Sequence, residues 1–145
     1  MQARRGELVD VLAGDGLVSE AGGELLGLVT WVVAAAANGE PGDGAALAEI
    51  RALGVAGPVR GRGIGMALLL AAEDVLRRAG VPEGWLVTTN DNLVALELYQ
   101  KAGWRLSELR AGAIDQLRRS IKPGIPAVGE HGIPLRDELE LTKEL

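Results

Sequence analysis

Three glycines in five positions, Gly61, Gly63 and Gly65, stand among two arginines, Arg60 and Arg62, in the stretch of this sequence that points most directly to chemistry. An apolar run precedes the stretch and a strongly helical segment follows it at once. Glycines let main-chain N–H groups converge without interference from Cβ atoms. A helix N-terminus adds unpaired donors and a partial positive charge. The sequence therefore predicts a strand-to-helix turn that binds a phosphate group, with the arginines as cations beside it.

Two common phosphate loops do not fit this turn. A Walker A loop needs Lys and then Ser or Thr after its last glycine, whereas Met66 and Ala67 follow Gly65 here. A dinucleotide fingerprint needs the spacing G-x-G-x-x-G, and in this turn the third glycine comes one place early. A nucleotide bound at the same turn stays an alternative.

The pattern Arg60-x-x-Gly63-x-Gly65 has a companion later in the chain. Asn92 is followed by Tyr99 seven residues on, and then by Lys101-Ala-Gly103-Trp104. Together the two motifs resemble the hallmarks of the GNAT superfamily of N-acetyltransferases, in particular a bacterial subset of unassigned members with a C-terminal extension. The resemblance covers residues 16–109, and residues 110–145 correspond to the extension.

This resemblance implies a mixed α/β sheet whose two central parallel strands splay, in an N-terminally shortened form of the family fold. It also implies a reaction, in which an unidentified primary amine attacks acetyl-CoA directly in a ternary complex. The residues implied to bind acetyl-CoA are Leu53, Gly54 and Val55 along the pantetheine arm, Arg60, Gly61, Arg62, Gly63, Ile64 and Gly65 at the pyrophosphate, and Asn92 and Tyr99 at the pantetheine and thiol end.

In the same family pattern, Tyr99 protonates the departing CoA thiolate. The physical chemistry agrees, because a thiol has a pKa near about 8.5 and a phenol near about 10, which makes the phenol a workable proton donor. Tyr99 is the only tyrosine of the chain. The alternative interpretation of Tyr99 is an aromatic core residue on an amphipathic helix.

The base that accepts the proton of the amine is less well defined by the sequence. Glu49 lies on the predicted central strand and could accept the proton directly or through water. The alternative is a solvent-facing strand residue paired with Arg51, and ordered water alone could also remove the proton. His131 is a chemically suitable base, but a lone histidine in a Pro- and Gly-rich tail favours a surface or loop-anchoring position.

Composition excludes several classes of function. The 145 residues include no cysteine and one histidine, so a Cys-type or multi-His metal site is excluded within one chain, and no metal is expected. The formal charge of −5 argues against nucleic-acid binding. No apolar run is long enough for a membrane span and no signal-peptide pattern is present, which predicts a cytoplasmic protein.

Periodicity and turn residues predict the elements around these motifs. One domain, residues 1–145, is expected, since the length suits a single core. In the helix over 63–79, Ile64, Leu68 and Val75 are expected to face the core and Glu73 and Asp74 the solvent. Strands are expected over 16–20, 24–35, 46–55, 84–89, 104–109 and 137–142, the last antiparallel in the sheet, with a tight hairpin at Ala21-Gly22-Gly23 between the first two. Helices are expected within 1–14 and over 93–101 and 113–120, and the run Asn90-Asp91-Asn92 provides capping residues for the helix over 93–101. A turn or mobile loop over 38–44 and a turn-rich segment over 122–134 complete the expected elements.

A second function stays open beside the enzyme. The shortened N-terminus removes helices that in the family form one wall of the acceptor pocket. The chain could therefore be a non-catalytic acyl-CoA-binding or regulatory module with an incomplete acceptor site. The extension could replace part of this wall, or a second copy in a homodimer could complete it.

Overall fold

The computed structural model describes residues 2–4, 7–35 and 46–145, and the predicted loop over 38–44 lies outside these ranges. The chain divides into two compact units. The first, called here the α1 unit, comprises Val11–Trp85 and Lys143–Leu145. The second, the α2–α3 unit, comprises Met1–Asp10 and Leu86–Thr142.

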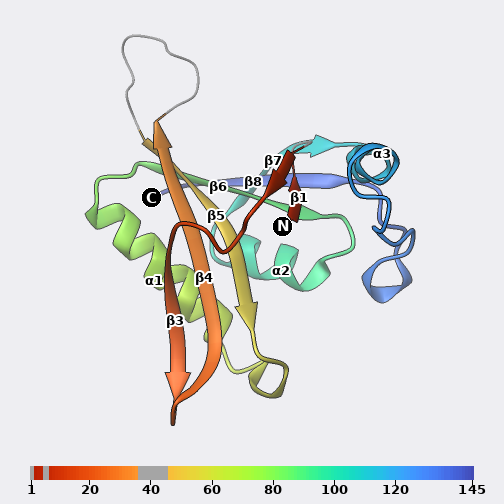
Figure 1. Ribbon diagram of the computed structural model, residues 1–145. Coiled ribbons are helices and arrows are strands. Elements are labelled where there is room, and N and C mark those ends of the chain that lie inside the picture. The colour runs from red at the N-terminus through yellow and green to blue at the C-terminus, as the bar shows by residue number, and fades with distance from the viewer. Residues whose placement is uncertain (1, 5–6, 36–45) are drawn as a thin grey trace. The chain divides into compact units, whose positions relative to one another are not determined.

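The α1 unit is built on an antiparallel hairpin (Figure 1). Strands β3 (Asp15–Ala21) and β4 (Glu24–Ala35) are joined by Gly22 and Gly23, whose φ angles of 58° and 81° are those of a two-residue hairpin turn. Strand β5 (Ala46–Val55) pairs antiparallel with β4. It also pairs parallel with the start of β6 (Glu83–Thr89), from Leu47–Glu83 to Glu49–Trp85. The predicted strands and hairpin are confirmed.

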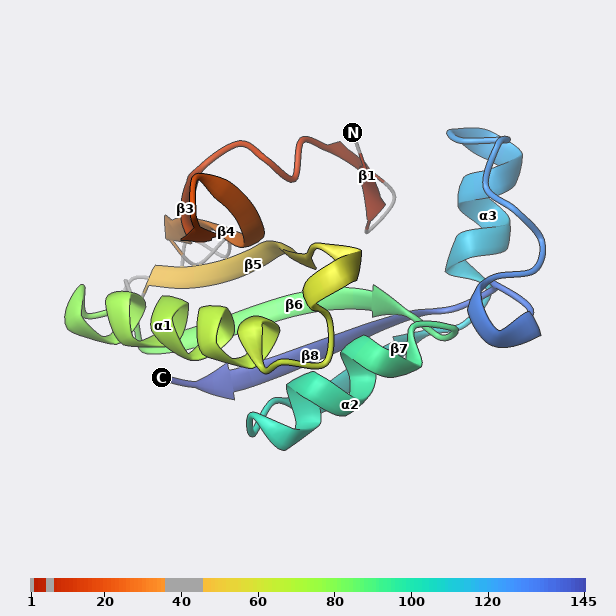
Figure 2. The same ribbon diagram turned by 90° about the horizontal axis from the view of Figure 1, so that it is seen from below.

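Helix α1 (Ile64–Arg78) packs against β3, β4 and β5 (Figure 2). The helix is confirmed, but the predicted orientation of two residues is wrong. Val75 is exposed, whereas the carboxylate of Glu73 is buried and forms an ion pair with Lys143 Nζ. The apolar face is turned toward Leu69, Ala72 and Leu76, so Glu73 comes to lie inside. Lys143, seventy positions along the chain, makes this burial tolerable.

The α2–α3 unit begins with two short antiparallel strands, β1 (Gln2–Arg4) and β2 (Glu7–Val9). The helix predicted within residues 1–14 is therefore wrong. A helix as short as this segment allows is marginal in water, because its first turn is costly to form. The β-branched Val9 and Val11 favour extended structure instead.

The remaining elements of the α2–α3 unit agree with the sequence-based expectations. In this unit the strands follow the order β6-β8-β7, with β7 antiparallel to β8, and α2 packs on β7 (Figure 2). The fold class is thus a mixed α/β arrangement of strands and helices, as predicted. No helix in the described ranges is long and apolar enough to span a membrane. The bounds are α2 (Leu93–Lys101), β7 (Arg105–Arg110), α3 (Ala113–Ser120) and β8 (Glu138–Glu144).

Candidate functional site

The turn between β5 and α1 has the shape that its glycines predict. A 3-10 turn over Gly57–Val59 leads to Arg60, and Gly61 and Gly63 adopt φ angles of 80° and 81°. These left-handed values favour glycine for conformational reasons, since a Cβ atom at either position would meet nothing within 4 Å. The turn is therefore open to its surroundings, and its main-chain N–H groups lie near the surface.

The N-terminus of α1 offers these donors without competition from its own side chains. Its N-cap, Gly63, has no side chain to accept a hydrogen bond, and the first turn contains no acidic residue. The first N–H groups of a helix have no partner within the helix, and the dipole leaves partial positive charge there. Arg60 and Arg62 are exposed beside it, and neither forms an ion pair in the part of the chain that the structure describes. This end of α1 suits an anion.

The end of β5 presents main-chain groups on the side away from β4. Ala56 donates its N–H to the carbonyl of Leu26, which makes this pair a hydrogen-bonded one. Groups in an antiparallel pair alternate in direction, so the N–H and C=O of Leu53 and Val55 point away from β4. Arg60 Nε donates to the Val55 carbonyl at 3.2 Å, which ties the turn to the strand. Gly54 between them is exposed.

Glu49 lies in the middle of β5, and its side chain is buried. Arg51 Nε donates to Glu49 Oε2 at 3.2 Å, so the predicted pair with Arg51 is confirmed. The solvent-facing position that accompanied this pair in the alternative interpretation is wrong. A base role for Glu49 would have to be carried out by a buried carboxylate that is paired with Arg51.

The β6–α2 turn contains Asn92, which caps α2. Its Oδ1 accepts a hydrogen bond from the N–H of Ala95 at 3.2 Å. This confirms the predicted cap, which satisfies one of the unpaired donors of the helix start. The cap fixes the orientation of the Asn92 amide, so its Nδ2 group is held at the first turn of α2.

Asn90, two residues earlier, does not cap the helix. It holds the segment from Lys122 to Asp137, which is called the C-terminal segment below. Its Oδ1 accepts from the N–H groups of Arg136 and Asp137, both at 3.0 Å, and its Nδ2 donates to the Pro134 carbonyl at 2.8 Å. The sequence predicts only helix capping for the run 90–92 and does not predict this function of Asn90. The only available signal is the number of polar residues in this run. One residue is enough to cap a helix, and residues 90–92 offer three.

Asp91 has a similar role. Its buried carboxylate accepts from Thr89 Oγ1 at 2.5 Å and from the N–H of Glu130 at 2.9 Å. A Cβ atom at Gly129 would lie 2.1 Å from Asp91 Oδ2, so only glycine allows this approach. Asp91 thereby fixes the tip of the C-terminal segment beside the turn that contains Asn92.

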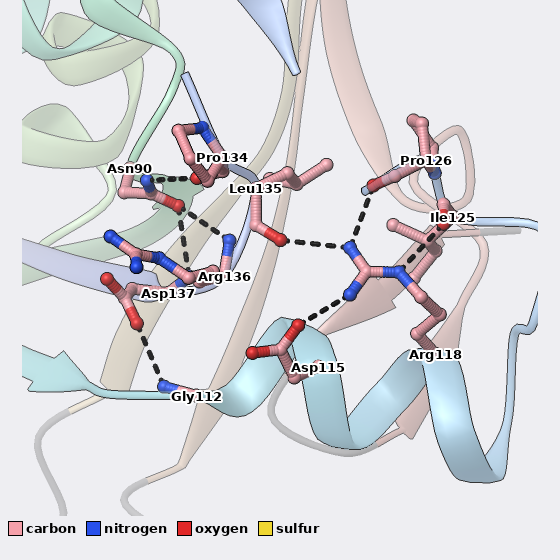
Figure 3. Close-up of polar contacts among 10 residues, drawn as sticks. All are labelled: Asn90, Gly112, Asp115, Arg118, Ile125, Pro126, Pro134, Leu135, Arg136 and Asp137. Carbon is pink, nitrogen blue, oxygen red and sulfur yellow. Dashed lines mark hydrogen bonds and ion pairs between the residues drawn. The ribbon is translucent and has the colours of Figure 1, made fainter. Parts of the chain in front are cut away.

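Arg118 on α3 fixes the base of the same segment (Figure 3). Its guanidinium donates to the carbonyls of Ile125 at 2.9 Å, Pro126 at 2.7 Å and Leu135 at 2.9 Å, and to Asp115 Oδ1 at 2.5 Å. The planar guanidinium, with five N–H groups, suits such a set of acceptors. The predicted turn-rich segment over 122–134 is confirmed, and Arg118 is the residue that organises it.

Tyr99 lies on α2 and is buried at 8% exposure. Its ring meets that of Trp104 edge-on, with centroids 6.3 Å apart and an interplanar angle of 60°. The main-chain N–H of Trp104 also donates to the main-chain carbonyl of Tyr99 at 2.9 Å. Tyr99 is thus held firmly by an aromatic neighbour from its own motif. His131 is exposed in the 3-10 turn over Glu130–Gly132, with a left-handed φ of 58°.

Arg110, on β7, has a pKa above the usual value of a guanidinium. Burial lowers the pKa of its guanidinium, but the hydrogen bond to Glu138 and the charges of Glu138, Glu140 and Glu108 outweigh burial and raise the pKa overall. Arg110 Nε meets Glu138 Oε2 at 2.6 Å. Arg110 therefore stays charged beside the buried carboxylates of β8.

Within residues 2–4, 7–35 and 46–145, no group of three His, Cys, Asp or Glu residues is arranged to hold a metal ion.

Comparison with known proteins agrees with these motifs. Residues 8–104 match the family model described as "Acetyltransferase (GNAT) family". Two relatives from Bacillus subtilis are the uncharacterized proteins YxbD, 46% identical over 60% of this chain and 54% of its own length, and YdhI, 34% identical over 92% and 75%. The chain thus spans about half the length of YxbD.

A solved structure adds a similar fold with a ligand. The structure of a GNAT family acetyltransferase from Elizabethkingia anophelis with acetyl-CoA bound is 25% identical and has a TM-score of 0.71. The match covers 93% of this chain and 78% of that one. Both motifs that carried the resemblance lie inside the matched residues 8–104. The chain therefore belongs to the GNAT family of acetyltransferases.

Proposed function

We propose that this chain binds acetyl-CoA and transfers the acetyl group to a primary amine. The observation that carries the proposal is the start of α1, which has no side-chain cap and no acidic residue and follows two left-handed glycines. We propose that the main chain of Arg60–Gly65, with the side chains of Arg60 and Arg62, takes the pyrophosphate. The outward main-chain groups of Leu53 and Val55, on either side of Gly54, would pair with the amides of the pantetheine arm.

The chemical step follows from the same assignment. The neutral amine attacks the thioester carbonyl, the C–N bond forms, and the C–S bond breaks with release of the CoA thiolate. Tyr99 gives its proton to the sulfur, and Asn92 binds the pantetheine near the thiol. The proton lost by the amine goes to Glu49 or to ordered water. General acid and base groups of this kind contribute roughly 10²- to 10⁴-fold to a rate.

We also propose that residues 1–145 act as one domain.

Two measurements test the proposal in sequence. CoA and acetyl-CoA are expected to raise the melting temperature of the protein, since a ligand that binds only the folded state stabilises it. A panel of primary amines with acetyl-CoA is then expected to release free thiol. ATP and NAD serve as the control ligands, and protection by either of them without protection by CoA would replace the cofactor assignment by a nucleotide.

The role of Tyr99 has a sharper test. Tyr99→Phe removes one oxygen and keeps the ring on Trp104, so the fold and the CoA affinity should be unchanged. The turnover number is expected to fall by about a hundredfold or more, because the leaving thiolate loses its proton donor. Unchanged turnover would exclude Tyr99 as the acid and leave it as a core aromatic.

One observation favours a second candidate function, a non-catalytic acyl-CoA-binding module. Tyr99 is buried against Trp104, as a purely structural aromatic would be. This candidate predicts that acetyl-CoA stabilises the protein as above while no amine of the panel yields product. The two candidates therefore differ in a single measurable outcome, thiol release in the presence of an amine.

A further inference from the structure

Gly27, near the start of the hairpin strand β4, lies opposite Val55, the last residue of β5. It belongs to neither of the two sequence motifs. We propose that Gly27 is a positioning residue for the phosphate-binding turn, because its missing side chain sets how closely the start of α1 approaches the end of β5. This proposal rests on the proposed function.

Gly27 has no room for a side chain. A Cβ atom there would lie 2.8 Å from the main-chain oxygen of Gly54, 3.0 Å from Leu68 Cδ1 and 3.2 Å from Ile64 Cγ2. The main-chain φ of Gly27 is not left-handed, so glycine is needed here for space rather than for conformation. Gly27 is thus a point of close approach among β4, β5 and α1.

The three neighbours belong to the proposed cofactor site or adjoin it. Gly54 is part of the strand end that would pair with the pantetheine arm. Ile64 is the first residue of α1, directly after the glycine turn, and Leu68 lies one helical turn further on. A methyl group at position 27 would push the strand end and the helix start apart, and the proposed pyrophosphate and pantetheine contacts depend on these two elements.

The rest of the α1 unit leaves few other ways to relieve this crowding. Gly27 is paired on both sides, with Ser19 of β3 and Val55 of β5. Beyond its first turn, α1 is held by the buried Leu69 and Ala72 and by the ion pair of Glu73 with Lys143. The glycine turn, in contrast, has open space around Gly61 and Gly63. The crowding caused by a methyl group at position 27 is therefore expected to displace the glycine turn.

A matched pair of variants tests the proposal. Gly27→Ala is compared with Gly16→Ala in β3, where a Cβ atom would lie 2.7 Å from the Val29 carbonyl oxygen, a similar close contact whose nearest atoms all belong to β4. Both variants are expected to lose similar stability in urea unfolding. Gly27→Ala alone should shift the amide NMR signals of Ile64, Gly65 and Met66 in the ligand-free protein. It alone should also weaken CoA binding, by about tenfold, as a preorganised site loses its geometry.

Each result decides a defined question. Wild-type amide signals for Ile64–Met66 in Gly27→Ala, or equal shifts in Gly16→Ala, would overturn the positioning role. Failure of the wild-type protein to bind CoA would overturn the proposed function, while the amide signals would still show whether Gly27 sets this spacing. If Gly27→Ala does not fold, the double variant with Leu68→Val, which lacks the Cδ1 atom, takes its place. The double variant is then compared with Leu68→Val alone, and it should still shift the amide signals of Ile64–Met66, because the close contact with the Gly54 oxygen remains. Unshifted signals would overturn the positioning role.

Discussion

Two regions of the molecule hold their main chain in place by opposite means. In the α1 unit, the turn over Arg60–Gly65 takes its shape from the left-handed glycines Gly61 and Gly63, and Arg60 adds one hydrogen bond to the end of β5. In the α2–α3 unit, the segment from Lys122 to Asp137 is held by polar side chains that reach its carbonyl and N–H groups, above all Arg118, Asn90 and Asp91. The first device leaves main-chain donors available for a ligand, and the second uses them up.

The difference teaches where a ligand is to be expected. The glycine turn lies at a helix start whose N–H groups have no side-chain partner, so an anion can take that place. In the C-terminal segment, the N–H groups of Glu130, Arg136 and Asp137 are already satisfied by Asp91 and Asn90. That segment is therefore a structural support beside the β6–α2 turn, and the glycine turn is where we propose the anion site.

The comparison is sharpened most by a buried ion pair of the α1 unit, that of Glu73 with Lys143. Lys143→Met would leave the carboxylate of Glu73 buried without its cation. The free energy of unfolding is expected to fall by about 3 kcal/mol, since breaking a buried ion pair leaves an uncompensated charge. Urea unfolding measures this change. The double variant Glu73→Leu/Lys143→Met is the control and should recover most of the loss, because two apolar groups replace the pair.

A loss below about 1 kcal/mol in Lys143→Met would contradict this prediction and show that the ion pair is solvated. The α1 unit would then rest on apolar packing and glycine shape alone. The expected loss, in contrast, would show that α1 is anchored by a residue near the C-terminus, which leaves its N-terminal turn as the part that can adjust.

The support role of the C-terminal segment is tested by Arg118→Met. Three carbonyls and one carboxylate lose a charged donor, and the expected loss of stability is about 2–3 kcal/mol. Hydrogen exchange should show the largest loss of protection at Leu135 and Gly129, whose N–H groups bond within the segment. The control is Arg119→Met on the adjacent, exposed arginine, with an expected change within about 0.5 kcal/mol. Equal effects of the two variants would contradict the role of Arg118.

The same contrast explains what could be predicted from the sequence. The bounds of β4, β5, α2 and α3 coincide with those predicted, because each depends on local signals such as the Gly22-Gly23 turn and the Asn92 cap. The glycine turn was also visible, since its residues are adjacent in the chain. The partners of Asn90 lie 44 to 47 residues away, and nothing near Asn90 indicates them.

The errors have the same origin. The orientation of Glu73 depends on Lys143, a distant residue, so helical periodicity alone placed Glu73 outside. The pairing of β1 with β2 joins two segments of three residues each, too short for a reliable periodicity. The residues of the proposed site are predicted by motif, and their chemical roles depend on the binding and activity tests above.

The smallest expected effect concerns the charge beside the glycine turn. Arg62→Gln should weaken CoA binding by about three- to tenfold at low salt and by less at high salt, because an exposed cation acts on a phosphate through a screened field. Arg77→Gln, at the opposite end of α1, makes the same charge change on an exposed side chain and should leave CoA affinity unchanged. Titration calorimetry at two salt concentrations measures the CoA affinity of both variants.

Equal weakening by the two variants would mean that CoA affinity depends only on the net charge of the protein. A loss that does not change with salt would mean that Arg62 makes a short, desolvated contact with the phosphate. The expected pattern instead places the phosphate at the N-terminal end of the helix, where main-chain donors contribute most of the binding and the arginine adds to them.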